Sequence, residues 1–517
     1  MEQKYLFGFD AGTYESKGVL CDFQGRVIAM AAKPHKLRSP APGFAEHDPI
    51  EDWWEALKAT VQELLAQSGV SAGQIAAVGI STIMAAITPV DAHCTPLRNA
   101  ILYGIDTRCV AQAEALNRAL GPEGIKRAGG PLCVEHFGPK ILWIKENEPE
   151  IYERASHFTI ASGFLTARLT GEYYVDKYSA RSACPMLDPA TMTWDEEGCR
   201  LVCPREKLPA IAESTYSVIG RVTAAAAAET GLAEGTAVIC GTTDAGAEAV
   251  SVGVVEPGDT MLMYGSTAFF ASVTNVLRED TGWWAGHYTL DGLYSYTGGM
   301  ATTGSLTRWL LDNLAPDLVE RQAAEGINAY TALFAEAEGI PLGSDGLICL
   351  PYFLGERMPF QDPAARGVFF GLTLRHSRGH LVHAALEGIG YGIDQNLDLM
   401  RRAGLPVRTV TAVGGGTKSP LWMQLVSDIC GIRQIIPEVA VGASYGDALM
   451  AGLGTGAIAS PAEIKKMVKV KYVTEPDPER HAQYAPYKEL YQQLYQRNRD
   501  LMHKLGERID SGTKGWR

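Results

Sequence analysis

Residues 5–22 read YLFGFDAGTYESKGVLCD, an apolar run that ends in a turn of small and polar residues before a second apolar run begins. The first run is short, and the glycines around the turn favour a strand over a helix. Two later regions repeat the pattern: Ala237 to Gly246 followed by Thr260 to Thr267, and Val407 to Thr417. Because such strands alternate with helical patterns along the chain, we predict an α/β fold.

Helical patterns lie between these strands. Asp48 is placed to cap a helix with Pro49 at its first position, and the apolar face continues through Trp54, Leu57 and Val61. Further helices are expected from about residue 379 to 393 and from 484 to 501. The stripe of the last helix could bind a partner, but a core-facing helix is the simpler interpretation.

The composition sets limits on the class of protein. The chain has 517 residues and a formal net charge of −13, which suggests two or three domains and a soluble globular class. We found no basic block, so nucleic acid and an anionic membrane are not expected partners. The chain shows no signal peptide and no apolar run of membrane-spanning length, and its ten cysteines are scattered. These features predict a cytoplasmic protein.

The turn after the first strand could bind phosphate. Gly12 leaves the backbone N–H groups accessible, while Thr13 and Ser16 add hydroxyls. Asp10, at the end of the strand, is placed to hold Mg²⁺ directly or through water. On the residues alone, a glycine turn beside an aspartate can equally be only a turn.

The later turns carry GSTA at 265–268 and GGGT at 414–417. Neither fits the P-loop pattern or the dinucleotide-binding pattern. Residues 388–392, GIGYG, superficially resemble the latter, but they lie in a helical pattern that close helix packing explains better.

Asp244 also follows a strand-like run. A carboxylate there could accept a proton from a substrate hydroxyl, or Asp244 could be a helix N-cap. His376, His380 and His383 could indicate a metal site, but no carboxylate cluster accompanies them. We found no local Ser-His-Asp or Cys-His arrangement, so hydrolase chemistry has no support.

Together these motifs resemble the FGGY family of carbohydrate kinases over nearly the whole chain. In the first half, the resemblance rests on PGFAEHDPIEDWW (42–54), ILYGIDTR (101–108), PKILWIKENEPEIYERASHF (139–158) and LTGEYYVDKYSARSACPMLD (169–188). In the second half, GVFFGLTLRHSRGHLVHAALE (367–387) satisfies a family signature in residue types and spacing. GGGTKSPLWMQLVSDICG (414–431) is similar to the family's adenosine-side motif.

The resemblance implies a two-lobed, actin-like ATPase fold of the ribonuclease H-like kind, with an active-site cleft between the lobes. Residues 1–246 would form the sugar-binding lobe with the first phosphate turn, and residues 247–517 the nucleotide-binding lobe. The implied reaction is Mg²⁺-dependent transfer of the ATP γ-phosphoryl to a hydroxyl of a ketose or polyol.

The family motifs also imply roles for individual residues. Asp244 would be the catalytic base, and Asp10 would organise Mg²⁺. The phosphate contacts would come from Gly12, Thr13, Ser16, Gly265, Ser266 and Thr267. The nucleotide side would be lined by Gly304, Arg308, Gly415 and Gly416.

The nearest subgroup resembles the xylulokinases, through PYFLGERMPFQDP (351–363) and GGGTKSPLW. The predicted substrate residues are Met84, Ala85, Asp106, Asp244 and Ala245. They depart from that subgroup, which has Met-His at 84–85 and Asp-Asn at 244–245. Both changes remove polar side chains expected to bind substrate hydroxyls. A xylulose-like pentulose is favoured, with glycerol or a tetritol as alternatives.

Two other classes remain as alternatives. A non-catalytic nucleotide or sugar sensor could keep the same lobes, although it would have no need of Asp10, Thr13 and Asp244. A filament-forming actin relative is the third hypothesis. A homodimer is expected from what is common among such enzymes rather than from these residues.

Overall fold

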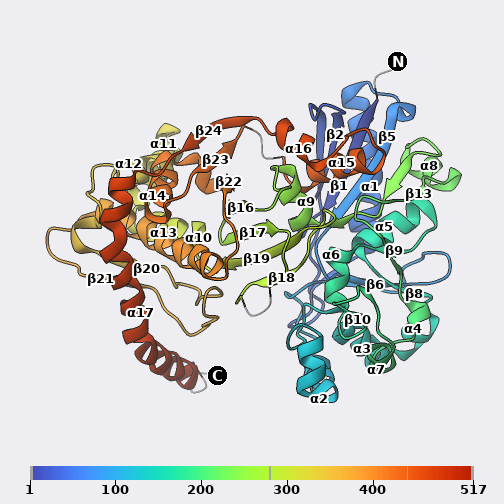
Figure 1. Cartoon of the computed structure of the whole chain (residues 1–517), viewed down its shortest axis with the longest axis horizontal. Coiled ribbons are helices and arrows are strands. Elements are labelled where there is room, and N and C mark those ends of the chain that lie inside the picture. Colours follow the sequence, from blue (N-terminus) through green and yellow to red (C-terminus); the bar gives the residue numbers. More distant parts are fainter. Residues whose placement is uncertain (1–3, 279–280, 439–440, 514–517) are drawn as a thin grey trace. The chain divides into compact units, whose positions relative to one another are not determined.

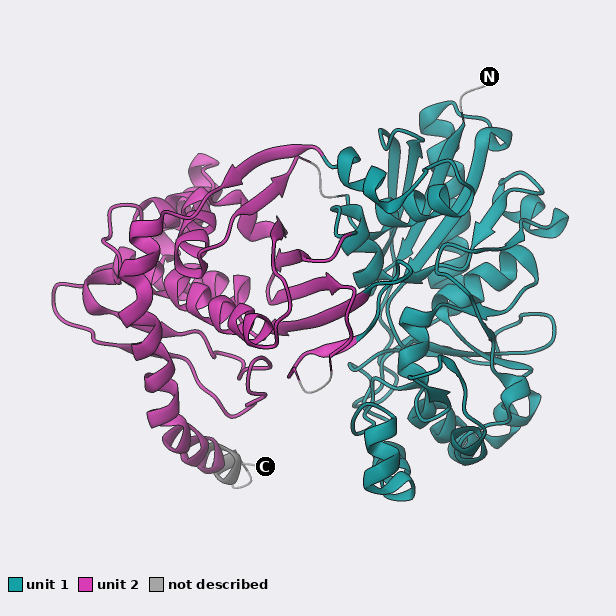
Figure 2. Ribbon diagram, viewed as in Figure 1, with its two compact units in different colours: residues 1–255, 286–293, 441–468 teal, residues 256–285, 294–440, 469–517 magenta. Residues whose placement is uncertain are grey.

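The computed structural model describes residues 4–278, 281–438 and 441–513. The chain divides into two compact units (Figures 1 and 2). Unit 1 comprises residues 1–255, 286–293 and 441–468, and unit 2 comprises residues 256–285, 294–440 and 469–517. The sequence predicts one boundary after residue 246, whereas in the structure each unit is assembled from separate stretches of chain.

The central sheet of unit 1 contains the first predicted strand. Its order is β13 (Val218–Arg221), β14 (Ala237–Ile239), β5 (Ile75–Thr82), β1 (Tyr5–Ala11), β2 (Glu15–Asp22) and β3 (Val27–Pro34). The strands β14, β5 and β1 are parallel, and the short β15 (Thr242–Thr243) also pairs in parallel with β5. The carboxyl ends of β1, β5 and β15 therefore meet at one edge of the sheet.

Helix α15 (Ala443–Gly454) brings a distant part of the chain onto this sheet. A Cβ on Gly8 would lie 1.8 Å from the carbonyl oxygen of Ser444, and one on Gly79 would lie 2.1 Å from that of Asp447. Only glycine permits so close an approach of helix to strand. This packing explains why residues 441–468 belong to unit 1 although they follow most of unit 2 in the sequence.

The predicted helix after Asp48 is confirmed. The Asp48 carboxylate accepts hydrogen bonds from the amides of Ile50 (2.9 Å) and Glu51 (3.1 Å). A π-helical turn (Pro49–Trp54) then leads into α1 (Glu55–Ser68). Trp54, Leu57 and Val61 are buried, as the apolar pattern predicts.

The other elements of unit 1 build a smaller sheet and the helices around it. This sheet has the order β4 (Glu46–His47), β7 (Ala100–Ile101), β6 (Ile87–Val90) and β8 (His157–Ile160). Two short pairs are β10 (Leu187–Asp188) with β11 (Thr193–Trp194), and β12 (Ala210–Ile211) with β9 (Tyr174–Val175). The helices are α2 (Val110–Arg127), α3 (Phe137–Asn147), α4 (Pro149–Arg154), α5 (Ala161–Thr170), α6 (Lys177–Ala180), α7 (Glu196–Leu201), α8 (Ala224–Thr230), α9 (Asp244–Ser251) and α16 (Pro461–Met467).

Unit 2 has a sheet of its own, which contains the two later predicted turns. It includes, in order, β19 (Tyr294–Met300), β17 (Ala268–Thr274), β16 (Asp259–Tyr264), β22 (Thr409–Val413), β23 (Gln434–Pro437) and β24 (Val470–Thr474). A short pair joins β20 (Ile348–Leu350) and β21 (Val368–Phe370). β18 (Trp284–His287) spans a point where the chain passes from one unit to the other.

The helices of unit 2 are α10 (Gly304–Leu314), α11 (Pro316–Glu325), α12 (Ala329–Ala335), α13 (Arg378–Arg402), α14 (Pro420–Cys430) and α17 (Pro478–Thr513). Residues 388–392 lie inside α13, which confirms the helical interpretation of their glycines. A Cβ on Gly388 would lie 2.3 Å from the Cys349 carbonyl oxygen, so close packing is indeed the reason for glycine there. Tyr484 and Tyr491 of α17 are buried, so this helix faces the core of unit 2.

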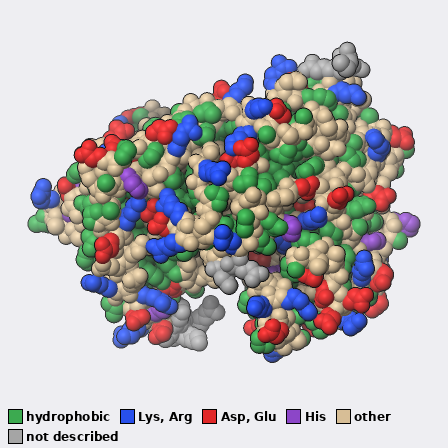
Figure 3. Space-filling model, viewed as in Figure 1, with side chains coloured by type: hydrophobic (Ala, Val, Ile, Leu, Met, Phe, Trp, Pro, Cys, Tyr) green, Lys and Arg blue, Asp and Glu red, His purple; other side chains and the backbone are tan. Residues whose placement is uncertain are grey.

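The surface carries charges of both signs. On the face shown in Figure 3, Lys and Arg side chains lie among Asp and Glu side chains rather than gathering in one block. Within the described residues, no helix is both long enough and apolar enough to cross a membrane.

Candidate functional site

The strand ends of unit 1 bring two predicted site residues together. Asp10 lies opposite Ser81 in the pairing of β1 with β5, and Thr242 lies opposite the same Ser81 in the pairing of β15 with β5. Asp244 follows β15 directly. Asp10 and Asp244, 234 positions apart in the sequence, therefore lie at the same edge of the sheet, at the ends of the two strands that flank β5.

The Ser81 hydroxyl joins Asp10 to a second carboxylate. Its oxygen lies 3.2 Å from Oδ1 of Asp10 and 2.7 Å from Oδ2 of Asp447 on α15. A hydroxyl has one hydrogen to donate, so it cannot satisfy both carboxylates at once. Burial raises the pKa of both Asp10 and Asp447 well above the usual range, and the charge of Asp10 adds to the effect on Asp447.

Asp244 has the environment of a proton acceptor. It is the first residue of α9, whose N-cap is Thr243, so the N-cap alternative for Asp244 is wrong. In the described part of the chain its half-buried carboxylate receives one hydrogen bond, from the Ala245 amide at 2.7 Å. Burial raises its pKa from 3.8 to about 6. At neutral pH the group is mostly ionised and yet basic enough to take a proton.

Glu248 lies one helical turn after Asp244 on α9. Burial, and after it the charge of Asp244, raises the pKa of Glu248 to about 7. Lys17 opposes this shift and also forms an ion pair with Glu15 at 2.8 Å. The strand ends thus carry an acidic group of side chains with one lysine nearby.

The turn after β1 has the predicted open form. The Gly12 amide donates to the Glu15 carbonyl at 3.1 Å, and the Thr13 and Tyr103 hydroxyls are 3.1 Å apart. Ser16 differs from Thr13, because the Ser16 hydroxyl is wholly buried and has no hydrogen-bond partner within the described residues. Its predicted phosphate contact is therefore not supported by this geometry.

The predicted substrate segment at 84–85 has a specific backbone shape. Ala85 adopts a left-handed conformation with φ 59°, and its carbonyl accepts a hydrogen bond of 2.6 Å from Nζ of Lys140. Lys140 is fully buried, and burial lowers its pKa to about 8. Met84 and Ala245 are half-buried.

Asp106 is also fully buried, but its oxygens are already engaged. Oδ2 accepts from the Ala45 amide at 2.7 Å, and Oδ1 and Oδ2 both accept from the Arg108 guanidinium. The predicted substrate contact of Asp106 is not supported by this arrangement, which favours a structural role.

In unit 2, the predicted turn at 265–267 joins β16 to β17 and is tied to the start of α10. The amide of Gly304 donates to the Gly265 carbonyl at 2.9 Å, and the Ser305 hydroxyl donates to the Ser266 carbonyl at 2.8 Å. A Cβ on Gly304 would lie 2.4 Å from the Gly265 carbonyl oxygen, so glycine is required there.

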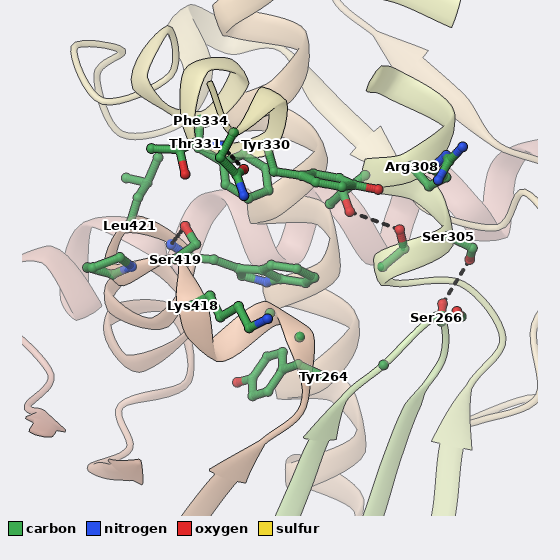
Figure 4. A pocket seen from close by; sticks show the side chains of 18 of the residues that line it. Tyr264, Ser266, Ser305, Arg308, Tyr330, Thr331, Phe334, Lys418, Ser419 and Leu421 are labelled. Carbon is green, nitrogen blue, oxygen red and sulfur yellow. Dashed lines mark hydrogen bonds between the residues drawn. The ribbon is translucent and has the colours of Figure 1, made fainter. Parts of the chain in front are cut away.

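These residues line a pocket of about 720 Å³ in unit 2 (Figure 4). Of the predicted nucleotide residues, six line it: Gly265, Ser266, Gly304, Arg308, Gly415 and Gly416. Thr267 is not among its lining residues. The turn at Gly415 leaves open space beside its backbone, since a Cβ on this residue would meet nothing within 4 Å.

Several lining residues of this pocket were not predicted from the sequence. Aromatic and aliphatic walls come from Tyr330 and Phe334 of α12 and from Leu421 and Trp422 of α14, and Lys418 lies between the turn and α14. Figure 4 shows Tyr330 reaching across the pocket toward Arg308. α12 has no local motif that marks it, whereas Trp422 and Lys418 belong to the quoted stretch 414–431.

The three histidines near the start of α13 have protein partners. His383 is buried, with Nδ1 2.9 Å from the Ser344 hydroxyl, and Nδ1 of His380 lies 2.9 Å from the Ser377 hydroxyl. Within the described residues, no group of three or more His, Cys, Asp or Glu side chains is arranged to hold a metal ion.

Comparison with known proteins places this geometry in a family. The model for the FGGY family of carbohydrate kinases matches residues 5–251 with its N-terminal domain and residues 260–455 with its C-terminal domain. Xylulose kinase of Escherichia coli K12 is 30% identical over 505 residues, covering 96% of this chain and 99% of that protein. Gluconokinase of Bacillus subtilis 168 is 28% identical over 471 residues, covering 90% and 91%.

The fold agrees with these matches. The crystal structure of xylulose kinase from Rhodospirillum rubrum superposes with a TM-score of 0.87 at 30% identity, covering 97% of this chain and all of that one. The chain belongs to the FGGY family of carbohydrate kinases. The predicted α/β fold of the two-lobed, actin-like kind is confirmed, and the protein is an ATP-dependent phosphotransferase that acts on an alcohol group of a sugar.

Proposed function

We propose that this kinase phosphorylates a ketose or polyol, with a xylulose-like pentulose as the favoured substrate, and that Asp244 is its general base. The observation that carries the proposal is the pair of carboxylates at the strand ends of unit 1. Asp244 has no side-chain partner within the described residues and a pKa of about 6, while Asp10 lies at the same sheet edge on the other side of β5.

In the proposed step, the Asp244 carboxylate takes the proton of the substrate hydroxyl. The freed oxygen forms a bond to the γ-phosphorus as the bond from that phosphorus to the leaving oxygen of ADP breaks. Phosphoryl transfer depends mainly on positioning and on charge stabilisation. A general base of this kind contributes about 10²–10⁴ in rate.

We propose that the unit 2 pocket takes the nucleoside of ATP. Its volume is in the usual range for a small-ligand site, and its aromatic walls suit a purine ring. The turns at 12–13 and 265–267 offer backbone N–H groups and hydroxyls of the kind that bind phosphate. Gly12, Thr13, Gly265, Ser266 and Thr267 are the proposed phosphate contacts.

The carboxylate of Asp10 is the proposed single protein ligand of a divalent cation. Asp10 has one oxygen within reach of Ser81, and its pKa is raised first by burial and then by the charges of Asp244 and Glu248, so positive charge beside it would be stabilised. Carboxylate oxygen is the ligand that Mg²⁺ prefers. Mg²⁺ held by Asp10 would neutralise phosphate charge during transfer.

The substrate preference rests on Met84, Ala85 and Ala245. Ala85 and Ala245 have no polar side-chain atoms, so they cannot reject a substrate that lacks a hydroxyl at those places. Similarity to xylulose kinases over the full length supports a pentulose, and similarity to a gluconokinase makes a sugar acid the first competitor to test.

The proposal is tested by measuring ADP release across a panel of D-xylulose, other pentuloses and hexuloses, gluconate, glycerol and erythritol. Asp244→Asn should lower kcat by about 10²–10⁴ with the preferred substrate, while nucleotide binding persists. Binding of AMP-PNP and sugar without any ADP release would instead support a sensor. Gluconate as the best substrate would replace the pentulose proposal and leave the role of Asp244 intact.

A further inference from the structure

His47 links the protein core to the first phosphate turn. It is the last residue of β4, it is 0% exposed, and its ring lies between Trp53 and the backbone of Thr13. The indole nitrogen of Trp53 lies 3.1 Å from Nδ1 of His47, and Nε2 of His47 lies 3.0 Å from the Thr13 carbonyl oxygen.

The chemistry of the two partners fixes the state of this ring. An indole N–H only donates and a carbonyl oxygen only accepts. Nδ1 must therefore accept, and Nε2 must carry the proton that is donated to Thr13. The ring is held as one neutral tautomer, and burial, helped by the adjacent His35, lowers the pKa of His47 to about 4.

The hydrogen bond from His47 to the Thr13 carbonyl also orients the amide of Tyr14. The Thr13–Tyr14 peptide is trans, so its C=O and N–H point in opposite directions. With the carbonyl directed at the buried His47, the Tyr14 N–H points away from it. Neither the Thr13 nor the Tyr14 amide has an intramolecular acceptor among residues 4–278, 281–438 and 441–513.

The rest of the turn is fixed by other contacts. The Gly12 amide is bonded to Glu15, the Thr13 hydroxyl to Tyr103, and the Tyr14 carbonyl accepts from the His35 amide at 2.9 Å. The Thr13–Tyr14 peptide plane is the part of the turn that the His47 ring contacts. Unpaired N–H groups on a turn are available to donate hydrogen bonds to an anion.

We propose that His47 is a positioning residue for the nucleotide: together with Trp53 it aims the Tyr14 amide at a phosphoryl oxygen. This inference rests on the proposed function, in which the turn contacts the phosphates of ATP.

Three variants keep both hydrogen bonds of the His47 ring, remove both, or remove only the one to Trp53. In His47→Gln, the amide oxygen accepts from Trp53 and the amide nitrogen donates to Thr13, so both bonds are retained. His47→Leu fills a similar volume but makes neither bond. Trp53→Phe removes only the indole donor, so Nε2 still donates to Thr13 while Nδ1 loses its partner.

The experiment measures binding of Mg²⁺–AMP-PNP and of adenosine by calorimetry. His47→Leu should weaken AMP-PNP about tenfold, the effect of one charge-assisted hydrogen bond, and leave adenosine unchanged. His47→Gln should stay within about twofold of the unmodified protein. Equal AMP-PNP affinity in the Leu and Gln variants, or an equal loss for adenosine, would overturn the inference.

Two further measurements distinguish a wrong role for His47 from a wrong phosphate role for the turn. In ¹⁵N-histidine spectra, the resonances missing from His47→Gln identify His47, which should show the Nε2–H tautomer from pH 8 to pH 5 and keep it in Trp53→Phe, because the Thr13 carbonyl still accepts from Nε2; the Nδ1–H tautomer would contradict the assignment. A Gly12→Ala variant tests the turn itself, since the added Cβ would lie 2.9 Å from the Glu15 carbonyl oxygen. If Gly12→Ala leaves AMP-PNP binding unchanged, the proposed phosphate role is wrong; if it weakens binding and His47→Leu does not, only the role of His47 is wrong.

Discussion

The pH dependence of kcat/KM should report the ionisation of Asp244. Burial raises the pKa of this carboxyl from 3.8 to about 6, so the protonated form, which cannot act as a base, persists to higher pH than in an exposed aspartate. The ionised fraction is about one half at pH 6, about one tenth at pH 5 and about nine tenths at pH 7. We therefore expect kcat/KM to rise about tenfold from pH 5 to pH 7 and then to level off.

The assay is chromatographic measurement of ADP at low sugar and saturating ATP between pH 5 and pH 9, which avoids coupling enzymes. Glu248→Gln is the matched control. It removes the neighbouring carboxyl, whose own pKa lies near 7 because of burial and the charge of Asp244. The rise near pH 6 should persist in this variant. A rise in kcat/KM centred near pH 4 would refute the assignment of Asp244 as the base. So would a rise near pH 6 that is absent from Glu248→Gln.

Three further outcomes are expected. Gly8→Ala should lower the free energy of unfolding by about 1–3 kcal/mol in urea melts, because its Cβ would meet the Ser444 carbonyl; Gly73→Ala, with nothing within 4 Å, is the control and should change it little. Tyr330→Ala should weaken adenosine binding by about 5- to 100-fold through lost stacking, with sugar binding unchanged. The pKa of Asp447 is raised by burial, so its cost to stability grows as pH rises. Asp447→Asn should therefore raise Tm more at pH 8 than at pH 5, and an equal change at both would contradict this.

The parts of the site that follow a strand directly were predictable from the sequence. Asp10 and Asp244 each follow a short apolar run, and the carboxyl ends of parallel strands gather at one edge. The glycine turns at 265 and 415 were found for the same reason. The assignment of their individual roles came from family motifs and stays a prediction.

Other features depend on contacts between distant segments, for which no local pattern exists. Ser81 and Asp447 are 366 positions apart, and nothing near Asp447 indicates that it reaches the strand ends. The aromatic wall from α12 is likewise set by packing. Ser16 is different, because alternation along β2 turns its side chain inward between exposed Glu15 and Lys17, and this alternation could have predicted its burial.

The place of α15 in the sequence affects how the chain folds during synthesis. When residue 255 leaves the ribosome, the glycine-bearing surface of β1 and β5 is still uncovered, and the helix that packs on it ends only at residue 454. At ordinary elongation rates the intervening segment takes about 10–40 s to make. During that time unit 1 exposes the surface of β1 and β5 that α15 later covers. A chain cut short before α15 therefore cannot complete unit 1.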